Sequence, residues 1–67
     1  MDYDQAVKWY RRSAKGENAG AQYRLGQCYY HGKGVKQNDF SAKYWYKKAA
    51  MQGEPDAERA LATIELL

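Results

Sequence analysis

The sequence predicts an all-α protein, an α/α solenoid of about two helix-turn-helix repeats with four helices. The chain matches itself when it is shifted by 36 positions, a repeat length typical of stacked helical hairpins. Apolar residues recur at helical spacing within each repeat, and residues suited to helix ends flank these runs. We place one domain at 1–67, with a first repeat at about 2–37 and a truncated second repeat at about 38–67.

The repeat depends on identical residues at equivalent positions of the two halves. The matched pairs are Ala6 and Ala42, Trp9 and Trp45, Tyr10 and Tyr46, Ala14 and Ala50, Ala21 and Ala57, and Leu25 and Leu61. We expect helices at 3–15, 19–31, 39–52 and 55–66.

The first helix is expected to begin after Asp2, a good N-cap residue, and to end at Gly16. Its apolar stripe consists of Ala6, Trp9, Tyr10, Ser13 and Ala14. We predict that this stripe, with both aromatic rings, packs in the core.

The second helix follows Asn18, another favourable N-cap, and its apolar stripe consists of Ala21, Leu25, Cys28 and Tyr29. We expect Gly32 to adopt the left-handed conformation that ends this helix. Gly34 then allows a second turn, and Val35 packs back against the helices.

The Gly32-Lys33-Gly34 stretch could also suggest a phosphate-binding loop. Such a loop needs a preceding strand, a Ser or Thr after the lysine and a following helix N-terminus. Here the glycines follow a helix and no Ser or Thr comes next. We therefore interpret the stretch as a helix end.

The third and fourth helices repeat this arrangement. Asn38 caps the third helix, and its stripe consists of Ala42, Trp45, Tyr46, Ala49 and Ala50. Gly53 ends it, and Pro55 opens the fourth helix, where a missing N–H is harmless. Glu54 is a poorer cap than Asn18. The fourth stripe consists of Ala57, Leu61 and Ile64.

The stretches AQYRLGQCYYHGKGV and NDFSAKYWYKKAAMQGEPDAERAL resemble the Sel-1-like repeat, a relative of the tetratricopeptide repeat. The motif residues are Ala42, Trp45, Tyr46, Lys48, Ala49, Ala50 and Gly53 in one half, and Ala21, Leu25, Gly26, Tyr29, Gly32, Gly34 and Val35 in the other. The second repeat departs from the pattern, with Ala62 and Glu65 in the positions of Gly26 and Tyr29. Gly16 also comes one residue early relative to Gly53.

The resemblance implies helix pairs that wind into a right-handed superhelix, with the first helix of each pair on the concave side. It also implies a scaffold or adaptor role in assembling protein complexes, in bacteria often in signalling or envelope processes. Gly26 and the alanines would allow close helix approach, while Trp9, Tyr10, Trp45 and Tyr46 would fill the space between helices.

Basic residues on the first helix of each repeat form the candidate partner-binding site. We assign to it Lys8, Arg11, Arg12, Tyr44, Lys47 and Lys48. Two basic rows on equivalent helices would suit a carboxylate or an acidic peptide. The alternative is that these side chains only complement helix dipoles and cover apolar surface.

Cys28 and His31 are three residues apart on one helix and could form a nucleophile and its base. We favour a buried, inert thiol and a histidine at a helix end, so we expect no enzyme and assign no catalytic residue. A hydrolase like the cysteine-rich relatives of the family is an alternative, but those relatives carry paired cysteines. One cysteine forms no internal disulfide, and we expect no metal site and no cofactor.

The formal net charge is +3, and the basic residues gather in the first half. This favours an acidic protein or peptide partner and does not reach the charge typical of nucleic-acid binding. We expect no membrane span and see no signal peptide, which favours the cytoplasm if the chain is complete as given.

Ile64, Leu66 and Leu67 place apolar residues at the end of the last helix. They could be a frayed end or an unfilled stacking surface. The alternative function is therefore a small capping piece or a fragment of a longer array, which forms a homodimer or stacks on further repeats.

Overall fold

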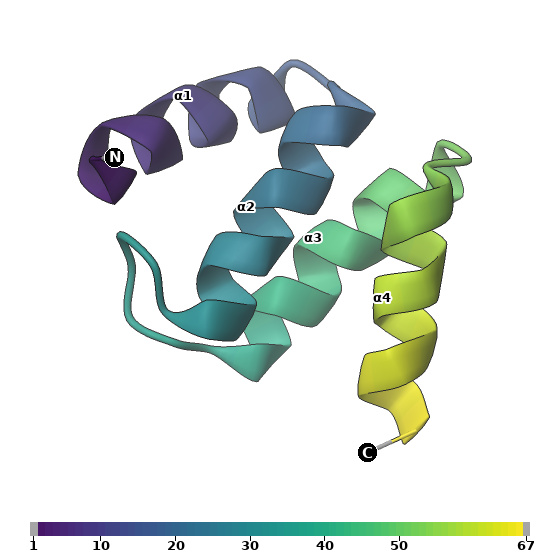
Figure 1. The fold of residues 1–67 in the computed structure, drawn as a ribbon. Coiled ribbons are helices and arrows are strands. Elements are labelled where there is room, and N and C mark those ends of the chain that lie inside the picture. Colours follow the sequence, from purple (N-terminus) through teal and green to yellow (C-terminus); the bar gives the residue numbers. More distant parts are fainter. Residues whose placement is uncertain (1, 67) are drawn as a thin grey trace.

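The computed structural model describes residues 2–66, which form four helices with three connections (Figure 1). The helices are α1 (Tyr3–Lys15), α2 (Ala19–His31), α3 (Asp39–Met51) and α4 (Pro55–Leu66). The prediction of an all-α fold with four sequential helices is confirmed. Leu67, which the sequence analysis assigned to the apolar end, lies outside the described residues.

The predicted N-caps are confirmed by their hydrogen bonds. The Asp2 carboxylate accepts from the Asp4 N–H at 3.0 Å, and the Asn18 and Asn38 side chains accept from backbone N–H groups three residues on. Glu54 also caps α4, because its carboxylate accepts from the Asp56 N–H at 3.1 Å. Each helix therefore begins where a short polar side chain or a glutamate satisfies a free backbone donor.

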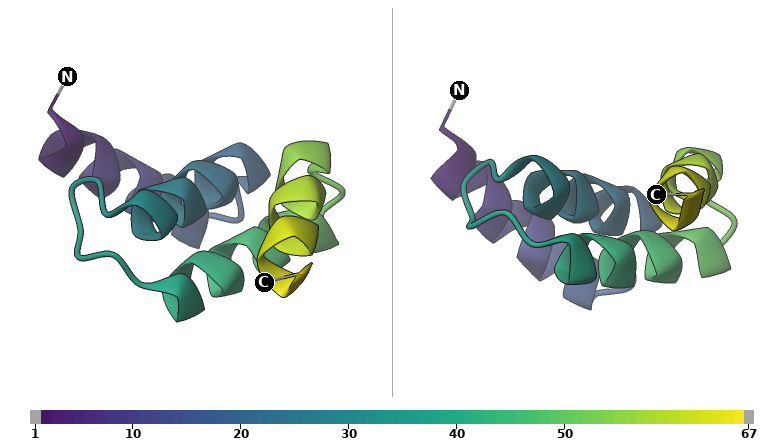
Figure 2. Two further views of the ribbon diagram at one scale, coloured as in Figure 1. Left: turned by 60° about the horizontal axis from the view of Figure 1, so that its bottom comes forward. Right: turned by 90° about the horizontal axis from the view of Figure 1, so that it is seen from below.

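Each helix packs mainly against the next one along the chain, and the contact between α2 and α3 is the most extensive. Figure 2 shows that α2 and α3 run side by side, while the start of α1 and α4 lie at opposite ends of the molecule. α2 therefore uses two faces, one against α1 and one against α3.

The face of α2 toward α1 builds the main core. Val7 and Ala14 of α1 cluster with Ala21, Leu25 and Cys28 of α2. Tyr10, Tyr29, Val35 and Trp45 pack around this cluster and are half-buried. The sequence pattern did not predict Val7 as a core residue, because Val7 lies between the residues of the predicted stripe.

The turn after α2 is formed as predicted. Gly32 has φ 70° and Gly34 has φ 75°, both in the left-handed region that favours glycine. A Cβ at Gly34 would lie 2.6 Å from the Tyr3 carbonyl oxygen and 2.8 Å from a Val7 methyl. The turn thus packs directly on the start of α1 and covers Val7.

The prediction that Trp9 packs in the core is wrong, because its side chain is 65 % exposed. Its counterpart Trp45 is half-buried and contacts the core cluster. The two tryptophans differ because Trp45 packs against the core cluster that α1 and α2 form, whereas among residues 2–66 no helix packs against the Trp9 side of α1.

The turn after α1 also differs from expectation in detail. Gly16 caps α1 with φ −84°, and the left-handed residue is Glu17, with φ 67°. Glu17 is the counterpart of Gly53, which has φ 87°. The early position of Gly16 therefore places a glutamate where the second repeat has a glycine.

Candidate functional site

The outer surface of α3 carries a shallow hollow of about 290 Å³. It is lined by Phe40, Lys43, Tyr44 and Lys47, whose spacing places them on one side of the helix. Phe40 is 82 % exposed and Tyr44 is also exposed. We call these four residues the α3 face. It combines aromatic rings and lysines, and no acidic side chain lines it.

Lys48 lies beside the α3 face and contacts two aromatic rings. Its ammonium nitrogen is 5.6 Å from the ring centroid of Tyr44 and 5.6 Å from that of Trp45. The Tyr44 and Trp45 rings meet edge to face, with centroids 5.1 Å apart. These contacts position Tyr44 while leaving one side of its ring exposed.

The structure therefore groups three of the six predicted site residues, Tyr44, Lys47 and Lys48, on α3. The other three, Lys8, Arg11 and Arg12, are exposed on α1. Arg11 donates from Nη2 to the Tyr29 hydroxyl at 3.1 Å. Among the described residues, no hydrogen bond or cation–π contact joins the α1 group to the α3 group.

Two members of the α3 face, Phe40 and Lys43, are not among the six residues predicted for the site. Lys43 lies next to the predicted Tyr44, whereas no predicted residue marks Phe40. It lies in the first turn of its helix, outside the apolar stripe. Its counterpart in the first repeat is Asp4, so the repeat pattern does not mark the position. A large apolar residue off the stripe was the available signal.

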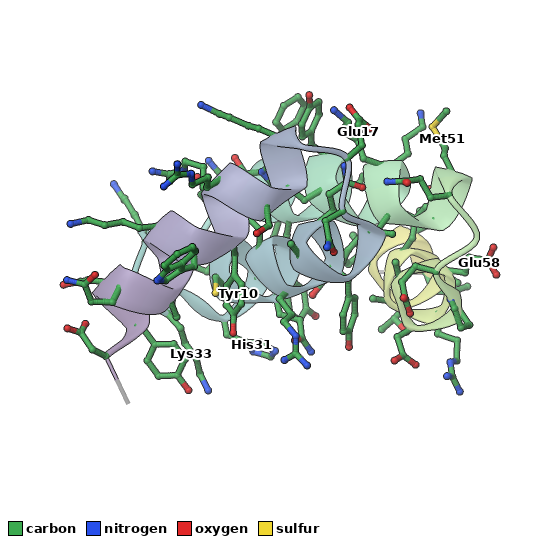
Figure 3. The ribbon with its side chains drawn as sticks, turned by 90° about the horizontal axis from the view of Figure 1, so that it is seen from above. Tyr10, Glu17, His31, Lys33, Met51 and Glu58 are labelled. Atoms are coloured by element: carbon green, nitrogen blue, oxygen red, sulfur yellow. The ribbon has the colours of Figure 1, made fainter. Side chains whose placement is uncertain are left out.

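A second hollow, of about 270 Å³, lies between α1, α2 and the turn after α2. It is lined by Tyr3, Tyr10, Arg24, Gln27, Cys28, His31 and Lys33. Figure 3 shows Tyr10, His31 and Lys33 on the same side of the molecule. The Lys33 ammonium nitrogen lies 5.2 Å from the Tyr3 ring centroid. We call this space the N-terminal hollow; sequence reasoning missed it, because its walls come from three separate segments.

Cys28 forms the floor of the N-terminal hollow and is buried. Burial raises the pKa of its thiol, and the nearby Lys33 ammonium only partly opposes this rise. The thiol is therefore protonated at neutral pH and a weak nucleophile. His31 packs edge-on against Tyr30, with ring centroids 5.1 Å apart, and no hydrogen bond links it to Cys28 among the described residues.

A third hollow, of about 190 Å³, lies between α2, α3 and α4. It is lined by Tyr23, Gln27, Tyr30, His31, Tyr46, Ala60, Thr63 and Ile64. The rings of Tyr23 and Tyr46 are 5.7 Å apart here. We call this space the inter-repeat hollow.

Residues 2–66 contain no group of three His, Cys, Asp or Glu side chains placed to hold a metal ion. None of their helices combines the length and apolar character that crossing a bilayer requires.

The chain is similar to segments of several longer proteins. It is 33% identical over 64 residues to "DAP3-binding cell death enhancer 1" of Rattus norvegicus, covering 96% of this chain and 13% of that protein. It is 39% identical over 56 residues to "Exopolysaccharide production negative regulator" of Rhizobium meliloti (strain 1021), covering 82% of this chain and 21% of that protein.

A third relative is "Chitin synthase regulator SKT5" of Saccharomyces cerevisiae, 43% identical over 49 residues, which are 73% of this chain and 7% of that protein. The chain thus spans at most 21% of the length of these three proteins. No solved structure matches it.

The Sel1 repeat family model matches the chain twice, over residues 2–18 and 19–54. The second match contains α2, the glycine turn and α3, the segments in which the motif residues were recognised. Such repeats are typically non-catalytic and generally mediate protein interactions. With four sequentially packed helices and matches over most of its length, the chain belongs to the Sel1 repeat family.

Proposed function

We propose that the chain is a non-enzymatic protein-interaction module that binds an acidic segment of a protein partner through the first helix of each repeat, with the α3 face as the main site. The main support is that two exposed aromatic side chains, Phe40 and Tyr44, lie beside Lys43 and Lys47 on one side of α3. Aromatic side chains supply most of the energy at protein interfaces, and unpaired lysines favour an acidic partner.

The relatives support this proposal through their printed names. Two are named as regulators, of exopolysaccharide production and of chitin synthase, and one is named as DAP3-binding. A module that holds one protein against another would suit such roles. Lys8, Arg11 and Arg12 would extend the same basic surface along α1 if the partner reaches both helices.

The burial and raised thiol pKa of Cys28 support a non-catalytic role. The hydrolase alternative would require this thiol to act as a nucleophile beside His31. If turnover of a β-lactam or ester substrate were detected with the wild-type chain and lost in Cys28→Ala, the hydrolase alternative would replace the proposal.

Binding can be tested with an array of acidic, neutral and basic peptides, probed with the wild-type chain. We expect the acidic peptides to bind, and we expect a combined Tyr44→Ser and Lys47→Glu variant to lose about 10- to 100-fold in affinity for them, as at interface hot spots. All four residues of the α3 face are exposed or outside the core, so circular dichroism should show an unchanged fold.

Lys36→Glu is the matched control, because Lys36 is exposed and lies outside all three hollows. This charge reversal should weaken binding far less than the α3 variant. Arg12→Glu tests whether the α1 group takes part. Equal affinity of all variants for every peptide would exclude the α3 face as the binding site.

A further inference from the structure

The same residue stripe is more deeply buried on α3 than on α1. On α3, Tyr46 is 3 % exposed and Trp45 is half-buried. On α1, Tyr10 is half-buried and Trp9 is exposed. We call Ala6, Trp9, Tyr10 and Ser13 the acceptor face of α1; their α3 counterparts are Ala42, Trp45, Tyr46 and Ala49. The molecule thus contains an occupied and an unoccupied version of one helix-binding surface.

The occupied version shows how a helix binds there. α2 lies across Tyr46 at Gly26, where an added Cβ would be 2.6 Å from the tyrosine ring. Tyr23 stacks on the same ring, and the buried Gln22 accepts from Gln52 at 2.9 Å. A helix suited to this surface therefore needs a very small residue at its centre and larger residues one turn away.

α4 is the second helix of its repeat, as α2 is of the first. The side of α4 that corresponds to the α3-facing side of α2 is exposed. Ala57, Ala60, Leu61 and Ile64 are the residues of α4 that are buried or half-buried. On another side of α4, Glu58, Ala62 and Glu65 are exposed, and Ala62 is the counterpart of Gly26. Leu66, which is 87 % exposed, is the counterpart of Tyr30. We call Glu58, Ala62, Glu65 and Leu66 the donor face of α4.

The N-terminal hollow and the inter-repeat hollow also differ in the helices that line them. One wall of the N-terminal hollow, consisting of Tyr10, Arg24, Gln27 and Cys28, is equivalent to one wall of the inter-repeat hollow, consisting of Tyr46, Ala60, Thr63 and Ile64. The opposite wall of the inter-repeat hollow is α2. Among residues 2–66 no helix takes the equivalent place at the N-terminal hollow, which is larger, about 270 Å³ against about 190 Å³.

The charges around the two faces are complementary. α1 carries four basic side chains and one acidic one, and the N-terminal hollow adds Arg24 and Lys33. α4 carries three acidic side chains and one basic one, Arg59, which pairs with Asp56 of its own helix. Glu58 lies at one end of the molecule, and Lys33 lies toward the other end (Figure 3). One copy can therefore present its acidic end to the basic end of another.

We propose that the donor face of α4 in one copy packs on the acceptor face of α1 in the next copy, repeating between chains the contact that α2 makes with α3 within one chain. Ala62 lies over Tyr10, farther from the ring than Gly26 lies from Tyr46 because alanine carries a Cβ. Leu66 enters the N-terminal hollow, and Trp9 is covered. The contact is head-to-tail, so each added copy leaves one donor and one acceptor face free, and assembly is open-ended.

Two single variants provide the decisive test, since each disables one face. Trp9→Glu places a carboxylate on the acceptor face and leaves the donor face intact, whereas Ala62→Trp blocks the donor face and leaves the acceptor face intact. Both positions are exposed, so both variants should fold, which circular dichroism verifies. We expect each variant alone to sediment as a monomer and their equimolar mixture to form a one-to-one dimer.

The wild-type chain should show an average mass that rises with concentration beyond that of a dimer, and added salt should weaken the association. Ala62→Gly should strengthen it several-fold, because glycine removes the Cβ that would meet the Tyr10 ring. Phe40→Ser is the control, because it alters the α3 face of the proposed function and should leave assembly unchanged.

A wild-type chain that stays monomeric up to about 1 mM would overturn the proposal, because even a weak contact would be partly formed there. A mixture of Trp9→Glu and Ala62→Trp that fails to dimerise would overturn it as well. Loss of assembly in Phe40→Ser but not in Trp9→Glu would place self-association on the α3 face instead.

Discussion

Glu17 is the one non-glycine residue with positive φ among residues 2–66. The chain reverses there between α1 and α2, and the Glu17 N–H donates to the Ala14 carbonyl at 3.1 Å. An L-residue with a side chain is strained in this conformation by roughly 1 kcal/mol. The second repeat avoids this strain with Gly53 at the equivalent position.

Glu17→Gly is therefore expected to stabilise the fold by up to about 0.5 kcal/mol, because relief of strain exceeds the added entropy of the unfolded chain. Urea unfolding followed by circular dichroism measures the change. Gly53→Ala is the reciprocal variant and should destabilise the fold, since alanine would adopt φ 87°. A lower stability of Glu17→Gly would contradict this account.

Gln22 shows a second residue-scale feature, a fully buried polar side chain. Its amide donates to the Ala14 carbonyl at 3.1 Å, and its oxygen accepts from Gln52 at 2.9 Å. The ends of α1 and α3 are thereby joined through α2. The sequence did not predict this link, because glutamine is usually exposed and the counterpart of Gln22 is Glu58.

At the scale of elements, the close contact of α2 with α3 depends on a glycine and a tyrosine. Gly26 lets the α2 backbone reach the Tyr46 ring, and Tyr46 is almost fully buried as a result. Small residues determine how near two helix axes can lie. The sequence predicted the role of both residues from the repeat motif.

Gly26→Ala should destabilise the fold by about 1–2 kcal/mol, because its Cβ would overlap Tyr46 by more than the gain in helix propensity offsets. Thermal unfolding of Gly26→Ala and of Gly20→Ala makes the comparison. Gly20 lies in the first turn of the same helix, where an added Cβ would meet only the Asn18 side chain at 3.4 Å. Equal effects of the two substitutions would argue against close packing at Gly26.

The sequence predicted the bounds of the helices better than the burial of their side chains. The 36-residue shift and the caps predicted the helix bounds, apart from the last residue of α3. The same shift implied that Trp9 and Trp45 have equal surroundings, and this was wrong. A repeat pattern indicates which residues are alike, whereas burial depends on neighbouring helices, and among residues 2–66 these differ between Trp9 and Trp45. The α3 face was only partly predicted, because Phe40 belongs to no repeated position.

At the scale of the whole molecule, two buried weak acids, the Tyr46 phenol and the Cys28 thiol, make the free energy of unfolding decrease at alkaline pH. Burial raises the pKa of Tyr46, and the neighbouring Tyr23, Tyr30 and Cys28 raise it further. Burial also raises the pKa of Cys28, with Lys33 acting in the opposite direction. The folded chain therefore holds both protons at pH values where the unfolded chain releases them.

The free energy of unfolding should thus be highest below pH ~8.5 and should fall as pH rises. The first decrease comes from ionisation of the thiol in the unfolded chain, and the second, near pH ~10, from ionisation of the phenol in the unfolded chain. Denaturant unfolding between pH 7 and about pH 11 measures the slope. Tyr46→Phe should remove the steeper loss near pH ~10, and Cys28→Ala the earlier loss. Identical pH profiles for wild type and Tyr46→Phe would contradict the assignment.

Because each helix packs mainly on the next along the chain, most stabilising contacts are short-range in sequence. Short-range contacts form quickly, so the chain should fold rapidly for its stability. Cooperativity is weakest at the ends of such a row, and Ala57 is the one fully buried residue among those of α4. The amide protons of α4 should therefore exchange with solvent sooner than those of α2. Docking onto another copy would protect the helix that a single chain holds least firmly.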